Sequence, residues 1–396
     1  MWIRHGLFCL FFVNAAAAQT PLSAIDWLEQ ATPEDPSALV LAEPPVTRNA
    51  TNPEITVSPL GASVETIGLV PASVTGLPET LWRGSDPTVL ADLIARVPVE
   101  NSPAMQSLLY TVLLSETLPP NNDSNDDTLL LARLDRLMAL GAVDPAQALV
   151  ENAGLRDRPE RFARWFDATL LTGQEDEACA LLQATPYLHP DYAPRIFCAA
   201  RKSDWQTAAL TLELAHALSL LPREELALLD RFLSPDIYEG APPLPAPDDP
   251  DPLAFRMFEA IGERLPSQPL SRAFATADLR DVAGWKPLIE AAERLTRIGA
   301  LPPNRLLGLY TKQKPAASGG VWDRVSALQR FETALRNQSV SGVEKTLPVL
   351  WSEMMPARLE VAIATLFAEP LSRLSLNDPT AKNLVWRLQL LAPDNN

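Results

Sequence analysis

The sequence is poor in the residues on which most catalytic and metal sites depend. Its 396 residues include only three histidines, three cysteines and five tyrosines. His189 and His216 lie far apart and lack further ligands at zinc spacing, so no metal site is expected. The chain also lacks the G-x-S-x-G, P-loop and G-x-G-x-x-G motifs of hydrolases and nucleotide-binding proteins. These absences predict a protein without a cofactor or metal, and they favour a function other than catalysis.

Positive charge is also scarce. The chain has 33 Lys and Arg residues against 49 Asp and Glu residues, which gives a net charge of -16. Such an acidic chain repels phosphate backbones, and no basic stripe offsets that repulsion. A nucleic-acid partner is therefore not expected.

Long apolar runs are absent beyond the first residues, so no transmembrane anchor is expected in the mature chain. Residues 1–18 begin with a cationic segment, continue with the apolar run GLFCLFFV and end in alanines up to Ala18. This order is typical of a secretory signal peptide cleaved before Gln19. An uncleaved N-terminal anchor is the alternative. Export of a chain this rich in alanine, leucine and proline predicts a periplasmic protein.

Proline is abundant, with 38 residues, and it sets the N-terminal part apart from the rest. In residues 19–86 repeated prolines leave no helical period, which predicts a disordered Pro-rich tail. Three apolar islands interrupt the tail, at residues 23–30, 54–60 and 68–82. They are candidate docking motifs, either for a partner or for the protein's own body. Their apolar residues include Trp27, Leu28, Ile55, Val57, Leu60 and Trp82.

From Asp86 onward, apolar residues recur with the spacing i, i+3, i+4 and i+7, which predicts helices. Asp86 and Pro87 have the pattern of a helix cap followed by a first-turn proline. Residues 239–252 are proline-rich and predict a stiff hinge between helical region I, residues 87–238, and helical region II, residues 253–396. The expected helices beyond the first cover residues 103–117, 127–140, 145–153, 159–172, 175–184, 191–201, 204–220, 223–233, 253–265, 271–279, 285–299, 303–310, 321–337, 341–353, 356–368 and 379–391.

A repeated turn marks three of these helix pairs. A small residue begins each turn, at intervals of 32 (141 to 173) and 30 (173 to 203) positions, and an alanine follows five residues later. The small residue permits a tight reversal, and the alanine lets the second helix press against the first. The residues concerned are Gly141 and Ala146, Gly173 and Ala178, and Ser203 and Ala208.

This pattern resembles the tetratricopeptide repeat, whose second helix opens with G-x-x-x-x-A, over about residues 127–220. The resemblance implies an all-α fold, an α-solenoid of antiparallel helical hairpins that binds proteins through a concave face. The chain departs from the family in the first helix of each unit, where Leu134, Phe166 and Ile196 replace a small residue. The hairpins are therefore expected to be divergent.

A longer repeat links the two helical regions. Trp205, Glu213 and Leu221 match Trp285, Glu293 and Leu301 at a constant offset of 80 positions (205 to 285). Three further matches share this register, at Pro222 and Pro302, Leu226 and Leu306, and Leu229 and Leu309. The second region is therefore expected to repeat the helical architecture of the first.

Two cysteines remain once the signal peptide is removed. Cys179 and Cys198 lie in successive helices, at nearly equal distances from the reversal near residues 187–190. Antiparallel packing would bring them to similar heights, within the Cα separation that a disulfide needs. An oxidising compartment permits the bond. Two reduced core cysteines are the alternative.

The acidic run at residues 121–127 invites comparison with a calcium loop. Asp123, Asn125 and Asp127 have the D-x-N-x-D spacing, but Thr128 and Leu134 replace the required glycine and glutamate. A solvated loop whose last aspartate caps the next helix is the expected structure.

The leading interpretation is a periplasmic scaffold or assembly factor that binds a protein partner in the cell envelope, with a groove holding a helix or an extended segment. The rival is a glycan-binding or glycan-cleaving superhelix. Soluble lytic transglycosylases contain such a superhelix, but their catalytic Glu is followed by Ser, and this chain contains no Glu-Ser pair.

Overall fold

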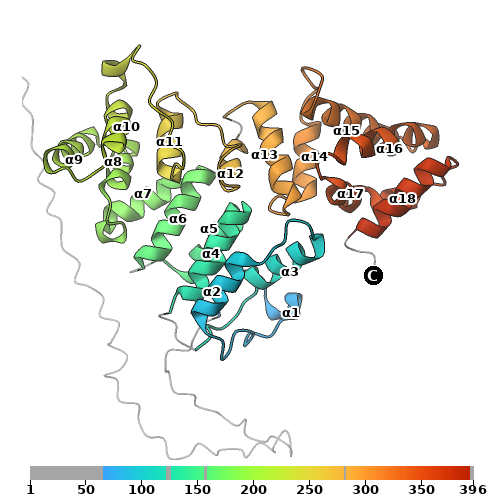
Figure 1. The fold of residues 1–396 in the computed structure, drawn as a ribbon, viewed down its shortest axis with the longest axis horizontal. Helices are drawn as coiled ribbons and strands as arrows, with labels where there is room; N and C mark the ends of the chain where they lie inside the picture. The colour runs from blue at the N-terminus through green and yellow to red at the C-terminus, as the bar shows by residue number, and fades with distance from the viewer. Residues whose placement is uncertain (1–65, 122–125, 156–157, 281, 393–396) are drawn as a thin grey trace, which may run out of the picture. The chain divides into compact units, whose positions relative to one another are not determined.

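The computed structural model describes residues 66–121, 126–155, 158–280 and 282–392 (Figure 1). Within these ranges the chain is all-helical, with eighteen α-helices and two short 3-10 helices. The expected all-α class is confirmed. The only β pairing among the described residues consists of two isolated bridges, Ile67 with Thr117 and Val70 with Ser115. The predicted signal peptide and residues 19–65 of the predicted tail lie outside the described residues.

The helices of the first part have the following bounds: α1 Ala72–Thr75, α2 Pro87–Arg96, α3 Pro103–Leu114, α4 Thr128–Leu140, α5 Val143–Ala153, α6 Pro159–Thr172, α7 Glu175–Ala184, η1 Pro186–Leu188, α8 Tyr192–Arg201, α9 Trp205–Leu218, α10 Arg223–Leu233 and η2 Pro235–Tyr238. Those of the second part are α11 Pro252–Ala260, α12 Phe274–Asp278, α13 Trp285–Arg297, α14 Pro303–Thr311, α15 Val321–Arg336, α16 Val340–Met354, α17 Glu360–Ser372 and α18 Pro379–Leu391. None of the described helices is both long and apolar enough to cross a bilayer.

Many of the prolines begin helices rather than interrupt them. Asp86 caps α2 by accepting a hydrogen bond from the Thr88 amide at 2.8 Å, and Pro87 is the first helical residue. Asp251 caps α11 in the same way, and Asp378 caps α18. A proline in the first turn loses no hydrogen bond, because that amide has no partner inside the helix. High proline content is therefore compatible with a helical chain.

Residues 66–85 differ from the expectation of a disordered tail that extends to residue 86. They pair with the end of α3 through the two bridges, and they contain the short helix α1. Trp82 is buried, and its indole Nε1 donates a hydrogen bond to the Thr117 hydroxyl at 3.0 Å. Prolines prevent a regular helix here but do not prevent an extended segment from burying its apolar side chains.

The described helices pack around two hydrophobic cores. The first extends from Trp82 and α2 through α11 and α12, and the second occupies α13 to α18. The proline segment at 239–252 is therefore not the border between them. Leu253, Phe255 and Phe258 place α11 in the first core, where it packs against α6 and α10. The border lies at α12 and α13.

The offset of 80 positions seen in the sequence is repeated in the helices. α9 begins at Trp205 and α13 at Trp285, while α10 begins at Arg223 and α14 at Pro303. α9 packs against α8 and α10, and α13 packs against α12 and α14. The three helices α8 to α10 thus correspond to α12 to α14.

Candidate functional site

The repeated turns form tight reversals between packed helices. Gly141 and Gly173 have positive φ angles of 83° and 80°, and Ser203 has 62°. A Cβ atom on Gly141 would lie 2.5 Å from Leu295 Cδ2, so a side chain there would also clash. The alanines Ala146, Ala178 and Ala208 are buried near the starts of α5, α7 and α9. These six residues shape the fold and offer no reactive group.

Cys179 of α7 and Cys198 of α8 form a disulfide in the structure, with their Cα atoms 4.9 Å apart. Both are fully buried, and α7 packs against α8. The bond closes a loop between residues 19 positions apart. It joins two helices of the region that carries the repeated turns.

Of the candidate docking residues, Trp27, Leu28, Ile55, Val57 and Leu60 lie outside the described residues. Trp82 lies within them and is buried against the chain's own helices. Trp82, from the island at residues 68–82, is therefore docked on the protein's own body.

The acidic run does not behave as expected. Asp123 and Asn125 lie outside the described residues. Asp127 does not cap α4 through its side chain; Asp126 Oδ1 instead accepts from the Thr128 amide at 3.0 Å. The Asp127 carboxylate accepts two hydrogen bonds from Arg161, at 2.9 Å to Nε and 2.6 Å to Nη2. This buried guanidinium draws the carboxylate away from the helix amides, because a bidentate ion pair is the stronger interaction.

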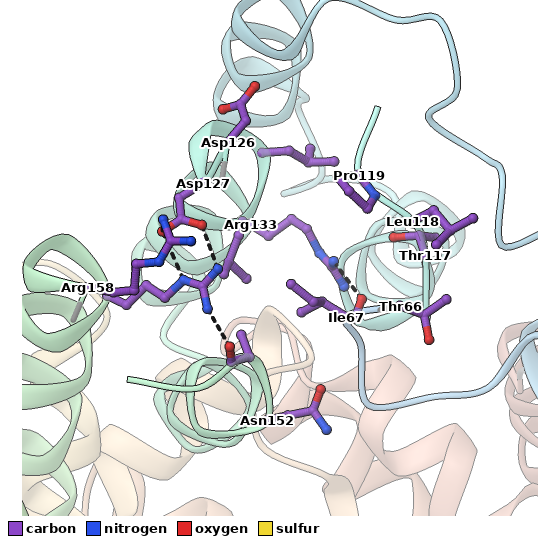
Figure 2. Close-up of a pocket in the computed structure, with 14 residues that line it drawn as sticks. Thr66, Ile67, Thr117, Leu118, Pro119, Asp126, Asp127, Arg133, Asn152 and Arg158 are labelled. Atoms are coloured by element: carbon purple, nitrogen blue, oxygen red, sulfur yellow. Dashed lines mark hydrogen bonds and ion pairs between the residues drawn. The ribbon is translucent and has the colours of Figure 1, made fainter. Parts of the chain in front are cut away.

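A cavity of about 270 Å³ lies beside this ion pair (Figure 2). Arg133, on α4, extends into it, and its buried guanidinium donates to the carbonyls of Leu113 at 2.7 Å, Ile67 at 3.0 Å and Ser115 at 2.9 Å. Burial lowers the pKa of Arg133 to about 10. Arg133 therefore fastens residues 67 and 113–115 to α4.

The charged groups of the cavity wall are bound mainly to other groups of the chain. Its lining residues include no histidine, cysteine, lysine or serine. Arg161 donates to the Asp127 carboxylate and to the carbonyls of Ala153 and Gly154, and Arg158 lies 3.7 Å from Asp127. The three arginines of the cavity thus bind acceptors of the chain itself and hold its segments together.

A second buried charge cluster was not anticipated from the sequence. Glu293 of α13 accepts hydrogen bonds from Arg324 Nε at 2.8 Å and Nη2 at 2.7 Å, and from the Tyr310 hydroxyl at 2.5 Å. Burial, followed by the Glu293 charge, raises the pKa of Tyr310 well above its usual value. The sequence carries one signal of this cluster, because Glu293 is a charged residue on the apolar side of an amphipathic helix. The cluster ties α13 to α14 and α15.

An exposed apolar surface lies on α9. Trp205 is 54% exposed, and Leu210, Leu214 and Leu218 are 58%, 46% and 60% exposed. The three leucines are spaced four residues apart and so share one side of the helix. The core side is formed by Ala208, Leu212 and Ala215. We call Leu210, Leu214 and Leu218 the α9 face; Trp205, five residues before Leu210, is exposed on another side of the helix. This face could not be predicted from the sequence, because a helix with two apolar sides has the same residue pattern as a fully buried helix.

Among the described residues no group of three or more His, Cys, Asp or Glu side chains is placed to hold a metal ion. Comparison with known proteins finds no matching family model, no similar curated protein and no similar solved structure.

Proposed function

We propose that this chain is an exported, periplasmic helical-repeat protein that binds other proteins, as a scaffold or assembly factor for a cell-envelope machine. In this proposal residues 1–18 are a signal peptide, and the helices form a TPR-like α-solenoid of antiparallel hairpins. The protein acts by holding partners and not by catalysis. The observation that supports a binding function is the α9 face.

Single exposed apolar residues are normal on a protein surface and need no explanation. A continuous row is different, because soluble monomers rarely expose apolar patches beyond a few hundred Å². Leu210, Leu214 and Leu218, on one side of α9, form such a row. Exposed leucine side chains gain free energy when association removes them from water. The α9 face therefore has the composition of a protein-binding surface.

The test is retention of envelope proteins by the purified mature chain. The variant Leu210→Ser/Leu214→Ser removes apolar area from the α9 face without adding charge. We expect it to retain at least about tenfold less of a partner that the wild-type chain retains. Leu93→Ser, at a similarly exposed position of α2, is the matched control. Equal retention by the wild-type chain and the α9 variant would contradict the proposal.

A further inference from the structure

The second half of the chain shows how the counterpart of α9 is covered. The Trp285 ring of α13 packs against the Trp322 ring of α15, with centroids 5.1 Å apart. On the same helix, the Glu293 carboxylate is bound by Arg324, also from α15. α15 therefore covers α13 with an aromatic side chain and a guanidinium placed two residues apart.

No described helix covers the same two positions on α9 as α15 covers them on α13. Trp205, the counterpart of Trp285, is 54% exposed, whereas Trp285 is 9% exposed. Glu213, the counterpart of Glu293, is exposed and forms no ion pair with any described residue. The chain thus keeps the tryptophan and the glutamate, but none of the helices described by the structure meets them as α15 meets α13.

The course of the chain explains the missing cover. After α14, residues 312–320 lead to α15, which packs against α13 and α14. After α10 and η2, the proline-rich residues 239–251 lead instead to α11, which packs against α6 and α10. Arg256 of α11 pairs with the buried Glu175 of α7, at 2.7 Å. α11 therefore packs on α6 and α10, and it does not take the place on α9 that α15 takes on α13.

The α9 face, on another side of the helix from Trp205, is also adapted to contact. Leu210 and Leu214 stand where α13 has Glu290 and Arg294 (210 + 80 = 290, 214 + 80 = 294). α13, which α15 already covers on the adjacent side, presents charged residues at these positions. On α9 the same positions are leucines, which gain free energy only when they are removed from water.

We propose that α9 docks an amphipathic helix of a partner protein, which places an aromatic side chain against Trp205 and a cationic side chain against Glu213. This inference rests on the proposed protein-binding function and specifies the chemistry of the partner. The acidic net charge of the chain favours the approach of a cationic helix.

The chain supplies a probe for this site in its own α15. A fluorescein-labelled peptide with the sequence of residues 320–337 is titrated with the full mature chain, and binding is followed by fluorescence anisotropy. We expect saturable binding that weakens about tenfold in Trp205→Ala and several-fold in Glu213→Gln. Peptides with Trp322→Ala or Arg324→Gln should show the same losses.

A charge exchange separates contact from folding effects. Glu213→Arg should weaken binding of the unaltered peptide and restore binding of the Arg324→Glu peptide, a recovery that a misfolded variant cannot give.

Trp285→Ala is the control for exchange of the peptide with the chain's own α15. Absence of saturable binding, or binding that depends on Trp285 and not on Trp205, would overturn the inference. If either result occurs while retention of envelope proteins still depends on Leu210 and Leu214, protein binding stands and only the proposed chemistry of the helix fails.

Discussion

At the scale of single residues, the cysteine pair carries the most direct prediction. Protein recovered from an oxidising compartment should expose no free thiol when unfolded without reductant, because Cys179 and Cys198 are bonded. Reduction should lower the free energy of unfolding by about 3 kcal/mol, since the bond restricts the unfolded chain. Alkylation followed by intact mass, and urea unfolding with and without reductant, measure the two effects. Two labelled thiols per chain in the non-reduced protein would show that the bond is absent.

Glu293 allows a comparison between buried and exposed ion pairs. Arg324→Gln removes the main partner of a carboxylate that is only 1% exposed, and it should lower the free energy of unfolding by about 3 kcal/mol. Arg336→Gln breaks a surface pair with Glu332 and should change it by less than about 1 kcal/mol. Urea denaturation of both variants gives the two values. Similar losses in both would mean that burial of Glu293 does not set the cost.

Asp167 of α6 makes stability depend on pH. Burial and the nearby charges of Asp251 and Asp135 raise its pKa to about 7, against the opposing effect of Arg164. Its ordinary pKa is 3.8, so between about pH 4 and pH 7 the folded state holds a proton that the unfolded state has lost. The contribution of this group to stability therefore falls as the pH rises through this range, with an upper limit of about 4 kcal/mol.

The variant Asp167→Asn cannot titrate at this position and should lose that dependence. Its stability relative to the wild-type chain is expected to be higher at pH 8 than at pH 5, as measured by urea unfolding at the two pH values. A difference that is the same at both pH values would place the pKa of Asp167 in its ordinary range.

At the scale of elements, helix bounds could be predicted from the sequence where neighbouring residues determine them. The helix expected at 175–184 matches α7, and that at 204–220 matches α9 within two residues at each end. The start of α9 is fixed locally, because the Asp204 side chain accepts a hydrogen bond from the Thr207 amide. Residues 66–85 could not be predicted in this way, because Trp82 and the paired backbone groups gain stability only from contact with α3 and α4.

Arg133 tests how this segment is held. Arg133→Met keeps an apolar stem but removes the donors to the carbonyls of residues 67, 113 and 115. Hydrogen exchange at residues 67–70 and 114–117 should accelerate at least about tenfold, because three buried carbonyls lose their partner. Exchange in α15 to α18 should not change. Arg164→Met, on the partly exposed pair with Asp135, is the control. Unchanged exchange at 67–70 would show that Arg133 does not hold the segment.

At the scale of the whole molecule, composition located the proline-rich segment but not the border between the cores. A loop can be recognised from its prolines, whereas the surface on which the next helix packs depends on side chains far away in the sequence. Arg256 and Phe255 commit α11 to the first core, and nothing near them in the sequence indicates this. The α9 face was missed for the same reason, since exposure is a property of the assembled fold.

The form of the exported protein is a prediction for the whole chain. We expect the protein recovered from the periplasm to begin at Gln19, because Ala16 and Ala18 have the spacing of a signal-peptidase site. Intact-mass measurement distinguishes this from a chain that retains residues 1–18. A mass that includes these residues would favour the uncleaved anchor.

The fastening of residues 67–70 has a mechanical consequence. Ile67 exchanges two backbone hydrogen bonds with Thr117, and its carbonyl also accepts from Arg133. A pulling force applied to the chain at Thr66 therefore meets these bonds first. Because they converge on one residue, they share the load and must rupture together rather than one after another. Leu69 and Val70, whose amides both bond to the Leu114 carbonyl, are released only afterwards. Residue 67 is therefore the first residue of the segment 66–70 to resist extension.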